Sequence, residues 1–292
     1  MDIVITYVDG NDPVWKIDYE NYTNVPVMDK RFRDWGTLKY LLRGIEVNMP
    51  FIRNVYLVVS HPTQVPRWAD TDHLKIVLHK DIIPEEHLPT FNSATIEMHL
   101  HRIDGLDEEY LYFNDDLYPL DRCEASDFFC DGKGVLGFSR HWLSSGMFKQ
   151  ICRNSDIYAR KALGMRPACC FVRPQHTCTP MFRSECEKLY SVLKEDISAS
   201  LTRTRTKDNV SQYLYLDYQY YKGLMIPERI SNKHFSVALA TPEGLEAFIM
   251  NPSRKIMCVN DVHMSESKYD ALKTAMTEAF EKKFPEKSRF EK

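Results

Sequence analysis

The chain has 292 residues and a formal net charge of −3, with 43% hydrophobic and 12% aromatic residues. These values predict one large folded domain, and the lack of a basic excess argues against nucleic acid as a partner. The eight cysteines include no CxxC pair of the zinc-ribbon kind, so we expect reduced thiols. Because there is no signal-peptide pattern and no long apolar run, we expect a cytoplasmic protein, with peripheral association at the inner face of the membrane as an open alternative.

The first predicted strand, residues 2–8, is continuously apolar, which is typical of a strand buried in a parallel sheet. Asp9 and Gly10 follow it. Asp9 could accept hydrogen bonds from a nucleotide, and Gly10 could let backbone approach a ligand closely. A plain turn is the alternative, since Asp-Gly is a common turn pair. Residues 14–32 have no clear period and are expected to pass over the site.

A helix is predicted at 37–47, because Leu38, Leu41, Leu42 and Ile45 fall on one face. Arg33 lies before this helix and Arg43 within it, and each could reach a phosphate or simply be solvated. Apolar strands are predicted at 55–59 and 74–79. The resulting order of strands and helices predicts a Rossmann-like (GT-A-like), doubly wound α/β fold with a mainly parallel sheet, helices on both faces and irregular insertions.

The densest group of functional side chains lies between residues 88 and 119. A helix is expected to begin at Asn92 or Ser93 and to end at Gly105, with Glu97 and His101 four residues apart on one face. A buried strand at 110–113 follows, and it leads directly into three polar residues, Asn114, Asp115 and Asp116. Ligands of open α/β sheets bind beyond the carboxyl ends of strands, so these residues are well placed for a divalent ion or a phosphate. The alternatives are a solvated turn and a surface ion pair.

The second half of the chain is less regular. Two short strands are expected in 123–138, a helix at 182–193, and a tyrosine-rich core helix at 211–223. A late apolar strand at 256–261 ends in Asn260 and Asp261 and so repeats the arrangement at Asp116. A closing helix is predicted at 266–283. We expect one domain, made of an α/β core (1–121), an insertion with further helices (122–254) and a closing strand and helix of the core (255–292).

Four stretches of the sequence carry a resemblance to a known family. They are DIVITYVDGNDP (2–13), the segment from Arg33 to Pro119 with FNSATIEMHLHRIDGL and YLYFNDD, the segment from His176 through Arg205 to Tyr221, and KIMCVND (255–261) with the FPEKSRFE ending. Together they resemble the Stealth family, the bacterial capsular-polysaccharide hexose-1-phosphate transferases that are related to the eukaryotic GlcNAc-1-phosphotransferase. The third stretch departs from the family pattern, with Thr-Cys-Thr-Pro after His176 and Asn209 in place of aspartate.

The resemblance implies that a UDP-sugar such as UDP-GlcNAc is the donor and a glycan or polysaccharide hydroxyl the acceptor. The acceptor oxygen would attack the β-phosphorus, and UMP would leave. The implied catalytic residues are Glu97, Asp116, His176 and Arg205. A Mg²⁺ or Mn²⁺ ion would be held by Asp115, Asp116 and Asp261. Substrate and nucleotide contacts are expected from Asp9, Gly10, Arg33, Arg43, Asn92, His101, Asn114 and Asn260.

Two other functions are compatible with these residues. A metal-dependent nucleotide-sugar glycosyltransferase would use Asp115 and Asp116 as metal ligands and would release UDP. A carbohydrate-binding scaffold that had kept the fold would show no turnover, although such a protein has no need of charged groups at strand ends.

Overall fold

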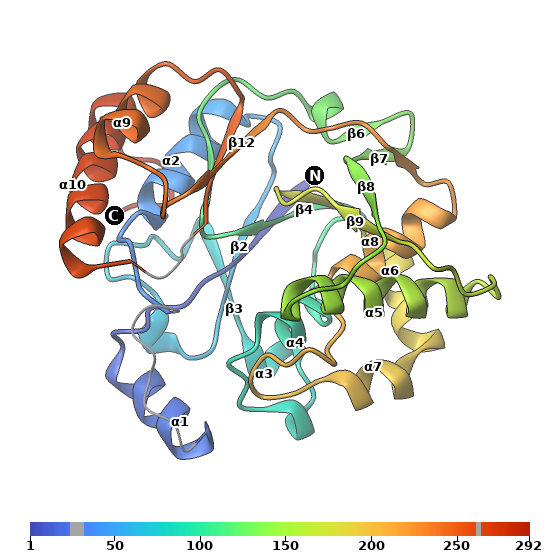
Figure 1. Ribbon diagram of the computed structural model, residues 1–292. Coiled ribbons are helices and arrows are strands. Elements are labelled where there is room, and N and C mark those ends of the chain that lie inside the picture. Colours follow the sequence, from blue (N-terminus) through green and yellow to red (C-terminus); the bar gives the residue numbers. More distant parts are fainter. Residues whose placement is uncertain (24–31, 261–263) are drawn as a thin grey trace.

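The computed structural model describes residues 1–23, 32–260 and 264–292, and its main sheet has the predicted α/β architecture (Figure 1). Four parallel strands, β1 (Asp2–Thr6), β2 (Val55–Val59), β3 (Leu74–Leu78) and β4 (Glu109–Asn114), are joined at one edge by antiparallel β10 (Thr179–Phe182), in the order β10-β4-β1-β2-β3. The order 3-2-1-4 of the parallel strands is that of a Rossmann fold. The predicted fold class is confirmed.

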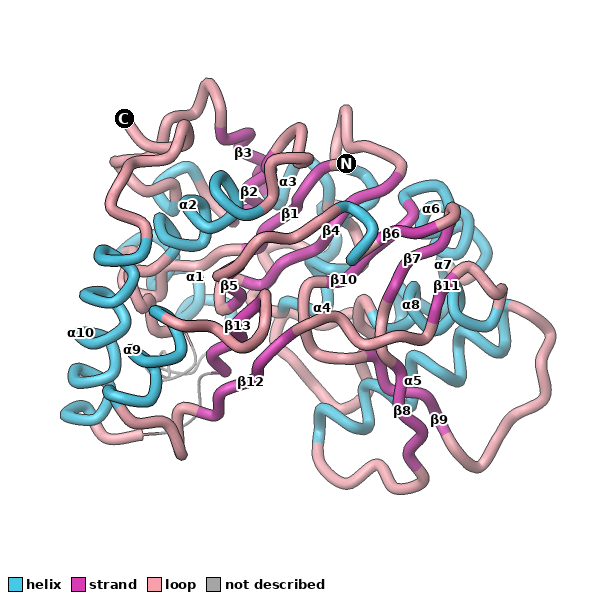
Figure 2. The backbone as a smooth tube through the Cα atoms, turned by 90° about the horizontal axis from the view of Figure 1, so that it is seen from above, coloured by secondary structure: helices cyan, strands magenta, loops and turns pink. Residues whose placement is uncertain are grey.

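Helices flank this sheet on two sides, as both views show (Figures 1 and 2). Helix α2 (Leu38–Asn48) connects β1 to β2 and buries the predicted apolar face. It lies very close to β5 (Leu117–Pro119), because a Cβ atom on Gly44 would come within 2.6 Å of the Pro119 carbonyl oxygen. Short helices α3 (His79–Ile82) and α4 (Ser93–Glu97) and the 3-10 turn Leu100–Arg102 lie between β3 and β4.

A second sheet of three strands, in the order β12-β13-β5, stands beside the main one (Figure 2). Its strands are β5, β12 (Asn232–Ser236) and β13 (Ile256–Asn260). Helices α9 (Pro242–Met250) and α10 (Glu266–Lys283) pack against each other next to it. The late apolar strand therefore exists as predicted, but it belongs to this second sheet and not to the main one.

The segment between β5 and β12 is built mainly from helices. It contains α5 (Met147–Ala162), α6 (Arg183–Val192), α7 (Lys194–Ser200) and α8 (Tyr213–Tyr221), with α5 packed on α8. Its short strands are β6 (Phe129–Cys130), β7 (Lys133–Val135), β8 (Phe138–His141), β9 (Phe171–Pro174) and β11 (Met225–Ile226). Because β10 from this segment completes the main sheet, residues 122–254 share one hydrophobic core with the first 121 residues.

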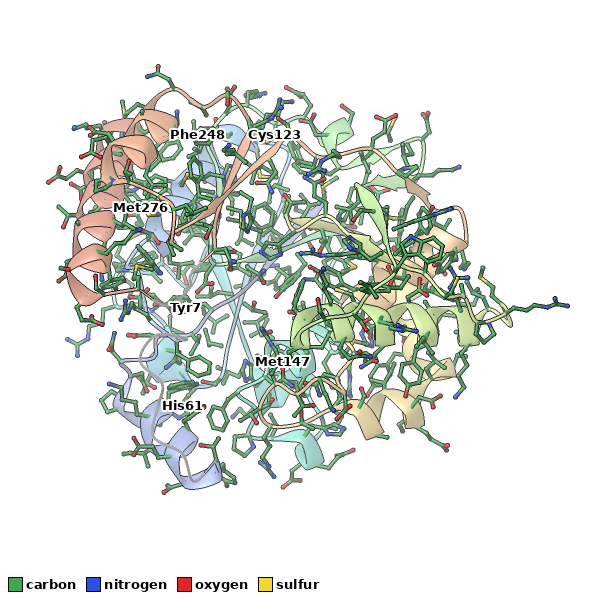
Figure 3. All side chains as sticks on the ribbon, viewed as in Figure 1. Tyr7, His61, Cys123, Met147, Phe248 and Met276 are labelled. Atoms are coloured by element: carbon green, nitrogen blue, oxygen red, sulfur yellow. The ribbon has the colours of Figure 1, made fainter. Side chains whose placement is uncertain are left out.

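Near the start of the chain, a helix occupies part of the segment for which no regular structure was predicted. Helix α1 (Pro13–Thr23) buries Trp15 and Tyr19 against Phe91 in a small aromatic cluster separate from the main core. Figure 3 shows the side chains that pack between these elements. Among the described helices, none combines the length and the apolar character that a bilayer-spanning helix needs.

Candidate active site

A cavity of about 1680 Å³ opens at the carboxyl ends of β1 and β4. Tyr7, the residue after β1, and Asp115, the residue after β4, both line it. These strands are neighbours at the point where the strand order reverses, which is where doubly wound sheets bind ligands. Sites for one small molecule usually measure about 300–1,000 Å³, so this cavity has room for two substrates.

The acidic side of the cavity is the turn that joins β4 to β5. Asn114, Asp115 and Asp116 all line it, as predicted. The Asn114 side chain accepts a hydrogen bond from the Tyr112 hydroxyl at 2.7 Å, and the Asp116 carbonyl accepts one from Val259 at 2.9 Å. Both contacts fix the turn, so the two carboxylates are held at the cavity wall.

Asp116 is the most unusual of these residues, because one of its oxygens has no partner. Oδ1 is buried without a hydrogen bond among the described atoms. Oδ2 lies 4.0 Å from Nε2 of His176 and accepts a hydrogen bond from the Cys258 thiol at 3.7 Å. An unsatisfied buried carboxylate oxygen is costly, and a cation would relieve that cost.

Glu97 forms a second acidic group inside the cavity. It is the last residue of α4, whose first turn is capped by the Asn92 side chain, which accepts from the Ala94 N–H. Glu97 is only 8% exposed, and its Oε2 accepts a hydrogen bond from the Gln212 N–H at 3.1 Å. Burial raises the pKa of Glu97, against the opposing effects of that N–H and of Arg205. The carboxyl group is therefore more basic than an exposed glutamate.

The basic side of the cavity comes from the second half of the chain. The Arg205 guanidinium lines it and donates a hydrogen bond to Ser93, which also hydrogen-bonds Glu97. His176, on the loop between β9 and β10, lines it too, and the Asn232 amide donates to its carbonyl oxygen at 2.9 Å. All four predicted catalytic residues thus lie on one cavity.

Some predicted substrate-binding residues lie elsewhere. The prediction that Arg43 reaches a phosphate is wrong: its guanidinium makes two hydrogen bonds to Glu291, at 2.7 and 2.8 Å, and a third to the Phe284 carbonyl. His101 does not share the cavity-facing side of Glu97, because a 3-10 turn follows α4. Its ring packs on Tyr190 and Tyr215, and burial lowers its pKa to about 3, so it is a neutral core residue.

Three other residues near the site have structural contacts instead of a place on the cavity wall. Asn92 is fully buried, and its amide donates to the Asn209 side chain at 3.0 Å. Asp9 accepts a hydrogen bond from the Asn11 N–H. Gly10 does permit a close approach, but the neighbour is Phe32, whose carbonyl oxygen would lie 2.1 Å from an added Cβ atom. Because Asn92 is fully buried, the ligand contact predicted for it is wrong, whereas those predicted for Asp9 and Gly10 stay predictions.

The remaining predicted residues divide into two groups. Arg33 and Asn260 line the cavity. Arg33 is also paired with Glu266 at 2.7 Å and stacks 4.1 Å from the ring centre of Tyr269. Asp261 lies outside the described residues, so its role as a metal ligand stays a prediction.

The cavity also contains charged groups that the sequence did not reveal. Arg173, Arg229, His234 and Asp34 line it. The pKa of Asp34 is raised, chiefly by burial and further by the negative charge of Asp9, while a Gly36 N–H opposes the shift. Arg173 and His234 stand on short strands with little apolar alternation, so no period in the sequence indicated which way they face.

Sequence comparison relates the chain to a known protein family. Residues 31–135 match the family model described as Stealth protein CR2, conserved region 2. This segment of the chain is therefore similar to the second conserved region of the Stealth family. The chain is 28% identical over 331 residues to the capsular polysaccharide phosphotransferase WcwK of Streptococcus pneumoniae, covering 100% of this chain and 99% of that one. It is 42% identical over 145 residues to the capsular polysaccharide phosphotransferase eps5J of Streptococcus thermophilus, and this match covers 47% of this chain and 60% of that one. The names of these relatives support a transferase enzyme, as predicted.

Among solved structures, the chain is similar to the galactosyltransferase LgtC in complex with donor and acceptor sugar analogs. The TM-score is 0.42 and the sequence identity 14%, and the match covers 97% of this chain and 96% of that one.

Proposed function

We propose that this protein transfers a sugar-1-phosphate from a UDP-sugar, such as UDP-GlcNAc, to a hydroxyl group of a glycan acceptor and releases UMP. The family and the names of its relatives support the coarser statement, phosphosugar transfer in polysaccharide synthesis. The observation that most supports the finer one is the meeting of Glu97, Asp116, His176 and Arg205 on a single cavity. The product would be part of a capsular or cell-surface polysaccharide, made in the cytoplasm or at the inner face of the membrane.

Glu97 is the residue we assign as general base. In the proposed reaction the acceptor oxygen forms a bond to the β-phosphorus, its proton passes to a carboxylate, and the bond between that phosphorus and the UMP oxygen breaks. A base works best when its pKa lies near the working pH, and burial moves the pKa of Glu97 in that direction. A positioned base is worth about 10²–10⁴-fold in rate.

Arg205 and His176 are assigned to the charge of the phosphates. Phosphoryl transfer depends mainly on positioning and on cations beside the phosphate oxygens, and a guanidinium can bind two of them at once. Ser93 already holds the Arg205 guanidinium beside Glu97, so the cation and the base face the same part of the cavity. His176 is placed to carry positive charge or to give a proton to the departing UMP.

Asp115 and Asp116 fit a Mg²⁺ or Mn²⁺ ion. Magnesium is usually bound by one or two carboxylates together with substrate phosphates, and the unpartnered buried oxygen of Asp116 suits a cation. When bound, such an ion neutralises phosphate charge. The side chains of this chain would hold it at the end of β4, beside the cations described above.

The products of the reaction test this proposal. The purified protein would be incubated with a panel of UDP-sugars and a short glycan acceptor, and the products would be analysed by mass spectrometry. UMP together with an acceptor heavier by one sugar phosphate is the expected result. UDP with an acceptor heavier by one sugar would instead establish a glycosyltransferase. Asp116→Asn should abolish transfer. Asp72→Asn, which changes an exposed aspartate in the turn before β3, should leave transfer unchanged.

A further inference from the structure

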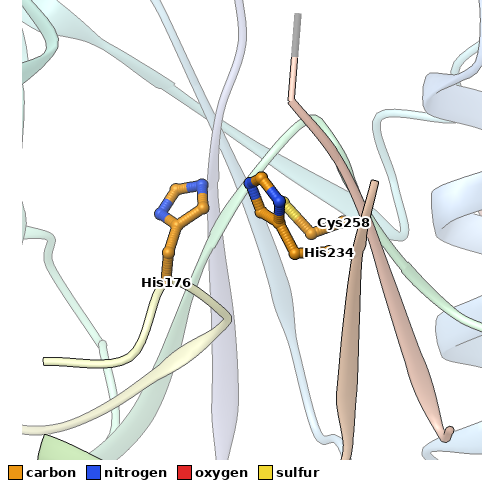
Figure 4. Close-up of side chains that lie close together, drawn as sticks. All are labelled: His176, His234 and Cys258. Atoms are coloured by element: carbon orange, nitrogen blue, oxygen red, sulfur yellow. The ribbon is translucent and has the colours of Figure 1, made fainter. Parts of the chain in front are cut away.

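Three side chains with nitrogen or sulfur donor atoms lie close together beside the cavity (Figure 4). His176 and His234 line the cavity, and Cys258 is buried behind them. A ring nitrogen of His176, a ring nitrogen of His234 and the Cys258 sulfur all lie within 4.8 Å of one another. Donor atoms bound to one tetrahedral zinc ion lie about 3.4–3.8 Å apart, given the usual Zn–N and Zn–S distances. Small rotations of the two histidines, both of which have solvent-accessible rings, would bring the donors to that spacing.

The fold itself brings these donors together. Strands β12 and β13 are parallel, and His234 is the register partner of Cys258, so their side chains leave the same face of the sheet at neighbouring positions. His176 comes from a different part of the chain. Its backbone is held to β12 by Asn232, two residues before His234 on the same face, and its ring centre lies 5.9 Å from that of His234.

Asp116 supplies a fourth donor beside the other three. Its Oδ2 atom lies 3.7 Å from the Cys258 sulfur and 4.0 Å from Nε2 of His176. Two imidazoles, one thiolate and one carboxylate form a set that suits Zn²⁺, whereas Mg²⁺ prefers oxygen donors alone. We propose that His176, His234 and Cys258 bind a Zn²⁺ ion, with Asp116 as the fourth ligand.

Binding would change the thiol as well as the ion. The Cys258 thiol donates to the Asp116 carboxylate, so it holds its proton. A zinc ion takes a thiolate, so binding releases that proton to solvent and places a double positive charge between the sulfur and the carboxylate. The ion would thus replace the thiol proton as the positive partner of the Asp116 carboxylate.

A consequence for the reaction follows, and it rests on the proposed function. Zinc bound here would occupy Asp116 and His176, which we assign to the metal and the phosphates of the substrate. Zn²⁺ should therefore inhibit transfer even when Mg²⁺ is in excess, because thiolate and imidazole ligands bind zinc far more tightly than magnesium.

Binding is measured directly, so the test does not depend on activity. Metal-free protein would be titrated with Zn²⁺ by calorimetry, and with Co²⁺ by absorption, which reports a thiolate ligand through a charge-transfer band. One equivalent is expected to bind. His234→Ala should weaken binding by more than the roughly 10–100-fold that loss of an outer-shell residue costs. Cys258→Ser should remove the cobalt–thiolate band while circular dichroism and the melting temperature show an intact fold.

Two control variants separate this site from other donors on the surface. Cys169 and Cys170 are adjacent and partly exposed, so they could hold zinc by themselves. Cys169→Ser/Cys170→Ser should bind zinc as the parent does, and so should His73→Ala, which changes an exposed histidine. Binding that survives both His234→Ala and Cys258→Ser, or that is lost in the Cys169/Cys170 variant, would overturn the proposal.

The inhibition is tested separately with the UDP-sugar assay. We expect zinc to inhibit the parent, and the ratio of activity without zinc to activity with zinc to fall toward one in His234→Ala. If zinc binds to the four residues and transfer is unaffected, the site stands and the roles proposed for Asp116 and His176 fail. If zinc does not bind while UMP is still released, the site fails and the proposed function stands.

Discussion

Replacing Glu97 by glutamine separates catalysis from stability at one position. Glutamine keeps the shape of the side chain and can still accept the hydrogen bond from Gln212 N–H, but it cannot take a proton from the acceptor. A general base is worth about 10²–10⁴-fold, so Glu97→Gln should lower kcat by that factor, or about 2.7–5.4 kcal/mol in activation free energy. The assay is the rate of UMP release at saturating UDP-sugar.

The same substitution should lower the rate but raise the stability of the fold at neutral pH. Because burial raises the pKa of Glu97 in the folded protein, the folded state binds the proton more tightly than the unfolded state does. Stability therefore falls as pH rises from the unfolded pKa to the folded one, and above that window the buried charge destabilises the fold. Glu97→Gln removes this charge, so its melting temperature should exceed that of the parent at neutral pH, and the difference should vanish near about pH 4.

The expected change in melting temperature depends on the pKa shift of Glu97 and on the length of the chain. Each unit by which a pKa is raised corresponds to about 1.4 kcal/mol, and each kcal/mol moves the melting temperature of a chain of this size by about 2–4 °C at most. Glu86→Gln, which changes an exposed glutamate, should alter neither rate nor stability. A Glu97→Gln enzyme with more than about a tenth of the parent rate would refute the role of Glu97 as base, given the expected range. A lower melting temperature at neutral pH would refute the argument from burial.

Other substitutions and treatments give further expectations. Arg205→Lys should lower kcat/KM by about 10²–10³-fold in the UMP-release assay, because an ammonium cannot bind two phosphate oxygens as a guanidinium does; a rate close to that of the parent would contradict the clamp. Arg43→Ala should lower the free energy of unfolding in urea by about 3–5 kcal/mol, because it removes the cationic partner of the buried Glu291 carboxylate. A change below about 1 kcal/mol, the value of a surface ion pair, would show that the pair is not buried in solution. Chelation with EDTA should stop UMP release and Mg²⁺ or Mn²⁺ should restore it, whereas full activity in EDTA would exclude the metal role of Asp115 and Asp116.

The sheet could be predicted from the sequence because its strands are continuous apolar runs. Strands were predicted at 2–8, 55–59 and 74–79, and the structure forms parallel strands at Asp2–Thr6, Val55–Val59 and Leu74–Leu78. The last of these is an edge strand and is only partly buried. The acidic end of β4 could be predicted for the same reason, since Asp115 and Asp116 directly follow such a run. The rule that ligands bind beyond the carboxyl ends of parallel strands then placed these residues on the cavity.

Helix α5 was missed because its buried face is partly polar. Ser155 and Asp156 are buried on it, the latter paired with Arg160 at 2.8 Å. The apolar residues buried beside them are Ile151, Cys152 and Ala159, so the helical period is present but the face contains few large apolar side chains. The α4 region was predicted as one helix but is two pieces. The Asn92 cap was read correctly, yet the chain tightens into a 3-10 turn after Glu97, and this turn takes His101 away from the cavity. Single-helix spacing could not show that change of direction.

The placement of Arg173 and His234 could not be predicted because it depends on tertiary contacts. Both come from short strands of the second half, and only their pairing with β8 and β13 fixes which face they present. His234 acquires its place next to Cys258 from a strand register between segments more than twenty residues apart. The residues of β12 alone, or of β13 alone, do not determine which positions pair.

Strand β10 has a consequence for how the protein folds during its synthesis. Residues 1–114 contain all four parallel strands, but β4 stays an open edge, with Tyr110 and Tyr112 exposed to pairing, until Thr179–Phe182 leave the ribosome. The hydrophobic edge of β4 therefore stays unpaired while the segment between β4 and β10 is translated. Deleting β10 should leave this edge free, and the truncated product would then be expected to aggregate in cells rather than accumulate as a smaller folded unit.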